Sequence, residues 1–164
     1  MKIVMVASES SAYIKAGGLG DVIHSLAKAL IKLGHSLYII MPKYSKIKAS
    51  LKGVGQGKVF FDGNWQEFSI YEDIKDHVRY YFIDFPKYYQ REHIYATPKG
   101  EYEDNPLRFG FLSLASLEVI KSLGIEPSLI HIHDWHTGLL PLYKKLYYPE
   151  FERTPTVFTI HNAM

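Results

Sequence analysis

The sequence predicts an α/β fold with an open, mostly parallel, Rossmann-like sheet, helices on both of its faces and an inserted β-hairpin or meander. Three observations predict it. Uninterrupted apolar runs alternate with amphipathic segments, a glycine-rich turn joins the first run to the first helix, and short aromatic segments interrupt the alternation near the middle. Uninterrupted apolar runs are typical of parallel strands that helices cover on both faces.

The first unit consists of a strand, a turn, a helix and a second strand. Residues 2–7, KIVMVA, predict a buried strand, and residues 36–41, SLYIIM, predict another that Pro42 closes. The helix between them begins near Leu19, and Gly34 is expected to end it. Its apolar side chains recur at helical spacing at Val22, Ile23, Leu26, Leu30 and Leu33. Strands connected in this way lie parallel, with a right-handed crossover.

The middle of the chain predicts short strands without helices between them. Residues 58–63, 65–72 and 77–84 are rich in aromatic side chains, and Asp62-Gly63-Asn64 is a turn signal between the first two segments. We expect a hairpin or meander inserted into the α/β frame. Residues 86–104 predict a long, partly irregular loop, and such loops in compact domains are often functional.

The last third returns to the α/β frame. Residues 105–124 predict a helix, with Asn105 as its cap and Pro106 at its first position. Three further segments are predicted: a strand over 128–133, a helical segment over 134–148 and a strand over 154–161. No helix follows to cover the last strand. We therefore expect the front piece of a longer protein, with an apolar patch exposed where its cover is missing.

Size and composition restrict the function classes. The 164 residues suffice for one domain, and 47% hydrophobic against 22% charged residues is a globular balance. The net charge of +2 is too small to indicate a nucleic-acid or membrane partner, and no apolar run reaches signal-peptide or membrane-span length. Cysteine is absent, which excludes thiolate chemistry and fits a reducing compartment. A cytoplasmic protein is expected.

Three polar clusters follow predicted strands. Residues 8–20 follow the first strand, residues 133–136 end and follow the strand over 128–133, and His161-Asn162 ends the last one. In open α/β sheets, ligands bind in the crevice beyond the carboxyl ends of the strands. If these strands are parallel, all three clusters face one crevice, and their convergence is stronger evidence for a site than any cluster alone.

The segment KAGGLGD, which begins at Lys15, predicts an anion site. Its glycines let the backbone approach a ligand, the helix that follows offers free N–H groups and a positive dipole end, and Lys15 adds a full charge. Neither standard nucleotide motif fits, because Ile23 stands where the dinucleotide pattern needs a small residue and no Gly-Lys-Ser/Thr follows. The alternative is a plain tight turn with an exposed lysine.

The segment HIHDWH supports two interpretations. His131 and His133 point to one face of a strand and His136 follows closely, so with Asp134 they are candidate zinc ligands, although their spacing departs from histidine-rich zinc motifs. Alternatively, His131 is an ordinary sheet residue and the loop recognises a sugar. Asp134 would then accept hydroxyl hydrogen bonds, and Trp135 would stack on a ring.

His161 is the last candidate. A lone histidine after an apolar strand is more often structural than catalytic. Its position at the carboxyl end of a predicted strand, beside Asn162, favours a functional role.

Together these residues resemble the starch and glycogen synthase family of GT-B glycosyltransferases. ASESSAYIKAGGLGDVIHSLAKAL resembles the family's amino-terminal signature, and REHIYATPKGEYEDNPLRFGF its tyrosine-bearing loop and Arg-Phe helix. IHIHDWHTGLLP resembles its His-Asp-Trp-His segment, and VFTIHN the strand that follows. The four motifs occur in order over nearly the whole chain. The family continues after His-Asn into a longer loop, where this sequence has only Ala163 and Met164.

The resemblance implies retaining transfer of glucose from a nucleotide-sugar, ADP-glucose in most members or UDP-glucose, to the non-reducing end of an α-1,4-glucan. It also implies one half of a GT-B fold. Residues 1–164 correspond to the amino-terminal, acceptor-side domain, without the carboxy-terminal domain that holds most of the nucleotide. That domain is the expected partner, and this chain alone is expected to be inactive. The alternative is a free-standing glucan-binding module.

The resemblance also assigns roles to single residues. Lys15, Gly17 and Gly18 match the loop that approaches the donor's phosphates and glucose. Asp21 matches the signature aspartate, which contacts donor or acceptor. The remaining matches lie around the sugar: Tyr95 and Asp134 line its site, His161 holds the transferred glucose, Asn162 supports His161, and Trp135 and His136 shape the pocket. His161 and Asp134 are thus the catalytic candidates. The family needs no metal or cofactor.

Overall fold

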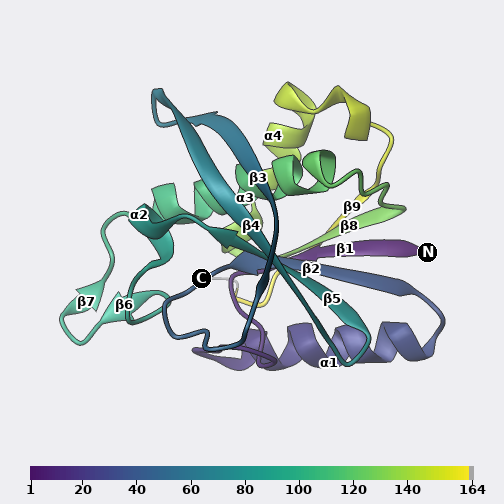
Figure 1. The fold of residues 1–164 in the computed structure, drawn as a ribbon, viewed down its shortest axis with the longest axis horizontal. Coiled ribbons are helices and arrows are strands. Elements are labelled where there is room, and N and C mark those ends of the chain that lie inside the picture. Colours follow the sequence, from purple (N-terminus) through teal and green to yellow (C-terminus); the bar gives the residue numbers. More distant parts are fainter. Residues whose placement is uncertain (163–164) are drawn as a thin grey trace.

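The computed structural model describes residues 1–162, and Ala163 and Met164 lie outside the described residues. Seven strands form one sheet in the order β3-β4-β5-β2-β1-β8-β9 (Figure 1). Their bounds are β1 (Lys2–Val6), β2 (Ser36–Pro42), β3 (Lys52–Phe61), β4 (Asn64–Lys75), β5 (Val78–Asp84), β8 (Leu129–His133) and β9 (Thr156–Thr159). A separate small hairpin consists of β6 (Ala96–Thr97) and β7 (Gly100–Glu101).

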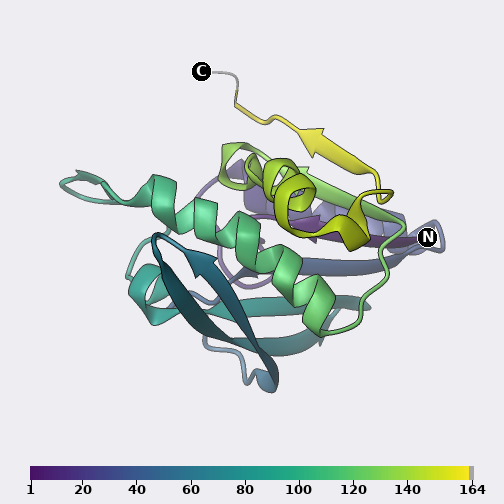
Figure 2. The same cartoon turned by 90° about the horizontal axis from the view of Figure 1, so that it is seen from above.

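Helices cover both faces of the sheet. They are α1 (Gly18–Lys32), α2 (Pro86–Tyr89), α3 (Asn105–Ser122) and α4 (Leu140–Tyr147), with the 3-10 turns η1 (Trp135–Thr137) and η2 (Pro149–Phe151). Figure 1 shows α1 below the sheet and α3 and α4 above it, and Figure 2 shows α3 and α4 from above. Each face has its own apolar core, one with Ile23 of α1 and one with Phe111 of α3. The predicted α/β class is confirmed.

The parallel frame and the meander belong to the same sheet. β1 pairs in parallel with β2 and β8, β2 pairs in parallel with β5, and β8 pairs in parallel with β9. β4 is antiparallel to both β3 and β5. The predicted meander is therefore confirmed, but it extends the frame at one edge, and its last strand, β5, is itself part of the parallel set.

β3 begins at Lys52, well before the predicted start at residue 58. The glycines of this stretch argue against a strand from local propensity alone. Gly57, however, pairs across the ladder with Phe68, and a Cβ atom at Gly57 would lie 2.2 Å from Cζ of Phe68. The ring of Phe68 covers the position where a side chain is missing, so the strand continues through the glycine.

α1 follows the prediction closely, except that two of the predicted apolar positions are exposed. Gly34 has a left-handed φ of 84° and ends the helix, as its place in the sequence predicts. Ile23 is fully buried, whereas Val22 and Leu33 are exposed. The buried stripe of α1 is therefore narrower than the apolar positions of its sequence suggest.

The segment before α3 is more ordered than a plain loop. Residues 86–104 contain α2 and the β6-β7 hairpin, and the hairpin projects away from the sheet in Figure 1. The cap position of α3 is Asp104, so the prediction that Asn105 is the cap is wrong. The side chain of Asn105 donates to the carbonyl of Tyr95 at 2.9 Å and accepts from Nη1 of Arg108 at 2.7 Å. It links helix and loop instead of capping the helix.

β9 forms the open edge of the sheet beside β8. It is shorter than the predicted strand over 154–161. Val157, Phe158 and Ile160 are exposed, so apolar side chains are uncovered at this strand. Within residues 1–162, no helix is both long and apolar enough to cross a bilayer.

Candidate functional site

The three polar clusters lie along one edge of the sheet, where the carboxyl ends of three neighbouring strands meet. β8 is flanked by β1 and β9, and all three run parallel, so the segments that follow them start side by side. The backbone N–H of Asp134 donates to the carbonyl of Thr159 at 2.9 Å and ties the segment after β8 to the end of β9. The predicted convergence of the backbone segments is confirmed.

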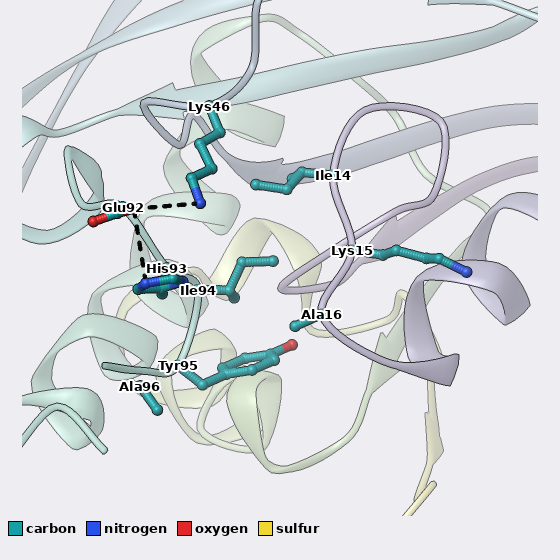
Figure 3. A pocket seen from close by; sticks show the side chains of 9 residues that line it. All are labelled: Ile14, Lys15, Ala16, Lys46, Glu92, His93, Ile94, Tyr95 and Ala96. Atoms are coloured by element: carbon teal, nitrogen blue, oxygen red, sulfur yellow. Dashed lines mark ion pairs between the residues drawn. The ribbon is translucent and has the colours of Figure 1, made fainter. Parts of the chain in front are cut away.

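A pocket of about 300 Å³ opens beside this edge (Figure 3). Residues 14–16 of the turn after β1 form one wall, residues 92–96 form the other, and Lys46 completes the lining. In Figure 3 the hydroxyl of Tyr95 points toward the turn after β1, whereas the side chain of Lys15 extends away from the pocket.

The pocket is also lined by charged groups that were not predicted from the sequence. The carboxylate of Glu92 lies 4.0 Å from Nζ of Lys46 and 4.0 Å from Nε2 of His93. These contacts are long and solvent-exposed, so they contribute little free energy. A polar ligand can therefore compete for Lys46 at low cost.

The carboxylate of Glu9, from the segment after β1, lies at the amino-terminal end of α1. Its side chain is buried, with 1% of its surface exposed. Its carboxylate accepts hydrogen bonds from the backbone N–H groups of Ala16, Gly17 (3.4 Å) and Gly20 (3.1 Å). Burial raises the pKa of Glu9, and these hydrogen bonds oppose the rise. The prediction that the helix start offers free N–H groups is wrong for these three amides, because an internal carboxylate already binds them.

Lys15 and Asp21 form an ion pair at the surface. Nζ of Lys15 donates to Oδ2 of Asp21 at 2.7 Å, and this hydrogen bond lowers the pKa of the aspartate. Both side chains are about half exposed. The ammonium group predicted to meet an anion is thus held by a solvent-screened partner on the first turn of α1.

Steric contacts within the fold require glycine at position 20 but not at positions 17 and 18. A Cβ atom at Gly20 would lie 2.6 Å from Cβ of Lys15 and 3.2 Å from the backbone nitrogen of Ser11, so the fold itself demands glycine there. At Gly17 the nearest atom would be 3.9 Å away, and at Gly18 no atom lies within 4 Å. Packing within the described residues therefore does not require glycine at positions 17 and 18. Glycine at these positions would let a ligand approach the backbone closely.

Tyr95 connects the turn after β1 to the segment after β8. A hydrogen bond of 2.6 Å joins its hydroxyl to Oγ of Ser8, and its ring lies 4.8 Å from the ring of His136. Burial, together with the nearby carboxylates of Glu9 and Asp134, raises the pKa of the Tyr95 phenol. The phenol therefore stays protonated and can act as a hydrogen-bond donor.

Arg108 holds the loop that carries Tyr95. Its side chain is fully buried, and it donates to the carbonyls of Tyr88 and Ile94, each at 2.8 Å. Burial lowers the pKa of its guanidinium group. One buried side chain on α3 thus fixes the two ends of the short segment that leads into Tyr95.

Asp134 combines backbone strain with an unpaired side-chain atom. Its φ of 62° is left-handed, a conformation that costs free energy for any residue other than glycine. The residue is 2% exposed, and its Oδ1 has no hydrogen-bond partner among residues 1–162. Thr137 supports the turn by donating from Oγ1 to the carbonyls of His133 and Asp134 at 2.9 and 3.2 Å. Strained, unsatisfied residues of this kind cluster at functional sites.

Trp135 and His136 form an aromatic cluster with Phe109. The centroid of the His136 ring lies 4.1 Å from the centroid of the Trp135 ring and 4.7 Å from that of the Phe109 ring. Burial is the main cause that lowers the pKa of His136 to about 4. Trp135 is 51% exposed, so one part of the indole is available for contact with a ligand.

Of the three remaining candidate histidines, His131 and His133 lie on β8 and His161 follows β9. His131 is bonded through Nε2 to Oγ1 of Thr159 at 2.8 Å, as expected of a sheet residue. Nδ1 of His133 lies 3.1 Å from Nε2 of His161. Among residues 1–162, no three histidine or carboxylate side chains are arranged as metal ligands. The described chain therefore does not assemble the zinc ligand set of the first interpretation, whereas the sheet-residue interpretation of His131 is confirmed.

The predicted residues fall into three neighbouring groups. The first lies in the turn after β1 and the first turn of α1 and consists of Lys15, Gly17, Gly18 and Asp21. The second forms the centre and consists of Tyr95, Asp134, Trp135 and His136. The third follows β9 and consists of His161 and the exposed Asn162. Ser8 and Glu9 lie within the predicted polar cluster of residues 8–20, but no individual role was predicted for them or for Arg108. A carboxylate among the small residues of ASESSA is a weak signal for Glu9. No sequence signal distinguishes Arg108 as fully buried.

Comparison with known proteins agrees with the fold. The sequence model of the starch synthase catalytic domain matches residues 2–164. A glycogen synthase of Hydrogenobaculum sp. is 48% identical over 163 residues, which are 99% of this chain and 34% of that protein. A glycogen synthase of Photobacterium profundum is 40% identical over 171 residues, covering 100% of this chain and 34% of the relative. The chain thus spans about a third of these relatives.

Two solved structures share the fold. The catalytic domain of starch synthase IV from Arabidopsis thaliana, bound to ADP and acarbose, matches with a TM-score of 0.87 and 33% identity over 98% of this chain and 34% of that chain. Sucrose-phosphate synthase from Thermosynechococcus elongatus matches with a TM-score of 0.54 at 14% identity, over 98% of this chain and 33% of that chain, and shows the fold alone. The first match joins structural likeness to substantial identity, and the family's sequence model covers all but the first residue. This chain belongs to the family of starch synthase catalytic domains.

Proposed function

We propose that this chain is the acceptor-side domain of a cytoplasmic glycogen synthase. The enzyme transfers glucose from a nucleotide-sugar, ADP-glucose, to the non-reducing end of an α-1,4-glucan and retains the anomeric configuration. The observation that carries the proposal is the buried Oδ1 of Asp134, which has no hydrogen-bond partner among residues 1–162, at the edge where the glycine turn and Tyr95 also lie. Relatives named glycogen synthase and a related structure bound to ADP and acarbose support this reaction.

The turn after β1 would meet the diphosphate of the donor. Among residues 1–162, the backbone N–H groups of Gly18 and Leu19 have no partner, and the space above Gly18 is open. Lys15 is held only by the exposed carboxylate of Asp21, so a diphosphate can attract the ammonium group at small cost. We expect amides, the helix dipole and Lys15 to neutralise the diphosphate together.

The segment after β8 would bind the sugar. A buried carboxylate oxygen without a donor costs free energy, and a sugar hydroxyl that donates to Oδ1 of Asp134 would recover it. The exposed part of Trp135 offers an apolar surface to a sugar ring. His161, supported by Asn162, would hold the transferred glucose from the neighbouring strand end.

Residues 1–164 would supply only one side of the active site. Transfer requires donor and acceptor to be held in register, and the family relatives are about three times as long as this chain. We propose that a carboxy-terminal domain holds most of the nucleotide and closes over this edge. The isolated chain is then expected to bind ligands weakly and to transfer no glucose.

The test is a chimera in which this chain replaces the matching third of the Hydrogenobaculum glycogen synthase. Glucose incorporation into glycogen from ADP-glucose is expected at a rate near that of the parent enzyme. Asp134→Asn in the chimera should lower kcat about 10²-fold or more, whereas Lys58→Ala on the exposed meander should have no effect.

Two results would overturn the proposal. Substantial transfer by the isolated chain would refute the half-site. A chimera that folds like its parent by circular dichroism, transfers no glucose and still binds maltooligosaccharide without nucleotide would favour the free-standing glucan-binding module.

A further inference from the structure

His133 is a buried histidine with no role in the proposed reaction. Its ring is fully buried, and Nδ1 lies 3.1 Å from Nε2 of His161. The two rings are stacked, with centroids 5.4 Å apart and planes 23° from parallel. The centroid of the His131 ring lies 4.0 Å from that of the His133 ring. Nε2 of His133 has no hydrogen-bond partner among the described residues.

Two proton arrangements can form the bond between these rings. In the first, His133 carries its proton on Nδ1 and donates to Nε2 of His161, which leaves Nε2 of His133 as an unpaired acceptor. In the second, His161 donates from Nε2, and His133 must carry its proton on Nε2, where a buried N–H has no acceptor. Buried N–H groups without an acceptor are rarer than under-used acceptors. The first arrangement is therefore favoured.

A cationic His133 is excluded by its surroundings. Burial and the neighbouring rings of His131 and His161 lower the pKa of His133 to about 3. The ring is neutral near pH 7 and carries one proton only. That proton serves the single hydrogen bond the structure records for the ring, the one to His161.

We propose that His133 is a positioning residue that holds His161 as the neutral tautomer protonated at Nδ1. The partner of one imidazole nitrogen decides which nitrogen bears the proton. With Nε2 of His161 engaged as an acceptor, its Nδ1–H has no partner among residues 1–162 and is the donor available to a ligand. If the proposed function holds, this donor meets a hydroxyl of the transferred glucose. The tautomer itself does not depend on that function.

Histidine ¹⁵N NMR of the 164-residue chain near pH 7 tests the tautomer directly. We expect His161 to show a protonated Nδ1 and an unprotonated Nε2. His133→Asn keeps a side-chain N–H donor and should preserve this pattern. His133→Phe keeps an aromatic ring without a donor and should shift the proton of His161 to Nε2, the form that histidine favours without a partner. A protonated Nε2 on His161 in the wild-type chain would overturn the inference whether or not either variant folds.

Activity in the chimera provides the second readout. His133→Phe should lower kcat/KM about tenfold, as losses of supporting hydrogen-bond partners do, and His133→Asn should restore most of it. An inactive chimera with the expected tautomer would contradict the proposed function alone. An active chimera in which His161 carries its proton on Nε2 would contradict this inference alone.

Discussion

The backbone N–H of Gly20 donates to Oε1 of Glu9 at 3.1 Å, inside a turn too tight for any larger residue at position 20. A buried carboxylate thus shapes the segment from Lys15 to Gly20 before any ligand arrives. A segment that is already ordered loses less conformational entropy on binding. The arrangement suits a turn whose task is to present Gly18 and Lys15 to an anion.

Two alanine substitutions separate folding from binding at this turn. Gly20→Ala places a methyl group 2.6 Å from Cβ of Lys15 and should lower the free energy of unfolding by roughly 1–3 kcal/mol. Gly18→Ala enters open space and should leave stability unchanged within about 0.5 kcal/mol. Urea unfolding measures both. In the chimera, Gly18→Ala should raise KM for ADP-glucose, and an unchanged KM would contradict the close approach of the donor.

Glu9→Gln should destabilise the chain. The carboxamide keeps one acceptor oxygen, but its NH₂ group must face a backbone N–H, so at least one of the three donors loses its partner. We expect the free energy of unfolding to fall by about 1–3 kcal/mol. Glu92→Gln on the exposed pocket wall is the matched control and should change stability by less than about 0.5 kcal/mol. Equal stability of the two variants would show that Glu9 does not hold the turn.

Arg108→Met removes the donors that fix the loop before Tyr95. The buried carbonyls of Tyr88 and Ile94 would lose their partner, at about 1–3 kcal/mol each. Thermal unfolding should begin at a clearly lower temperature, and limited proteolysis should cleave residues 86–104 faster. Arg153→Met, at an exposed position, controls for the loss of one charge. Resistance of the loop to proteolysis in the Arg108 variant would contradict this role.

Acid should destabilise the chain through its buried histidines. The pKa of His136 is about 4 and that of His133 about 3 in the folded state, below the unfolded value near 6.5. As pH falls, the unfolded chain takes up these protons first, so their contribution is complete above about pH 6.5 and is lost toward the folded pKa values. Each histidine adds a slope of up to about 1.4 kcal/mol per pH unit.

Urea unfolding between pH 7 and pH 5 measures that slope. His136→Gln should flatten it by the share of one histidine. His77→Asn, at an exposed turn position with a φ of 63° that asparagine tolerates, should leave it unchanged. Parallel profiles for wild type and His136→Gln would contradict the burial of a neutral ring.

The fold was predictable where local signals determine it. The first strand, the helix that Gly34 ends and the second strand follow from periodicity and one backbone conformation. The extent of β3 was not predictable from local signals, because the ring that covers Gly57 belongs to Phe68 on the neighbouring strand. The predicted cap role of Asn105 was wrong for a similar reason, because its side chain donates a hydrogen bond to a loop that is distant in sequence and does not cap its own helix.

The candidate site divides in the same way. The turn from Lys15 to Asp21 is contiguous in sequence, and the prediction found it as a unit. The role of Glu9 was not predicted because its partners depend on the three-dimensional shape of that turn. The bond between His133 and His161 depends on the register of β8 and β9, in which His133 lies opposite Thr159, and no spacing within one segment reveals it.

The central claim is that the segments after β1, β8 and β9 form one sugar-binding surface. An amide ¹H–¹⁵N titration of this chain with a maltooligosaccharide at millimolar concentration tests it most directly, with the exposed indole of Trp65 as a remote reference. The predicted result is a set of localised shifts at Lys15, Tyr95, Asp134 and His161, with Trp65 unmoved. Shifts that gather elsewhere, or none at these residues, would contradict it.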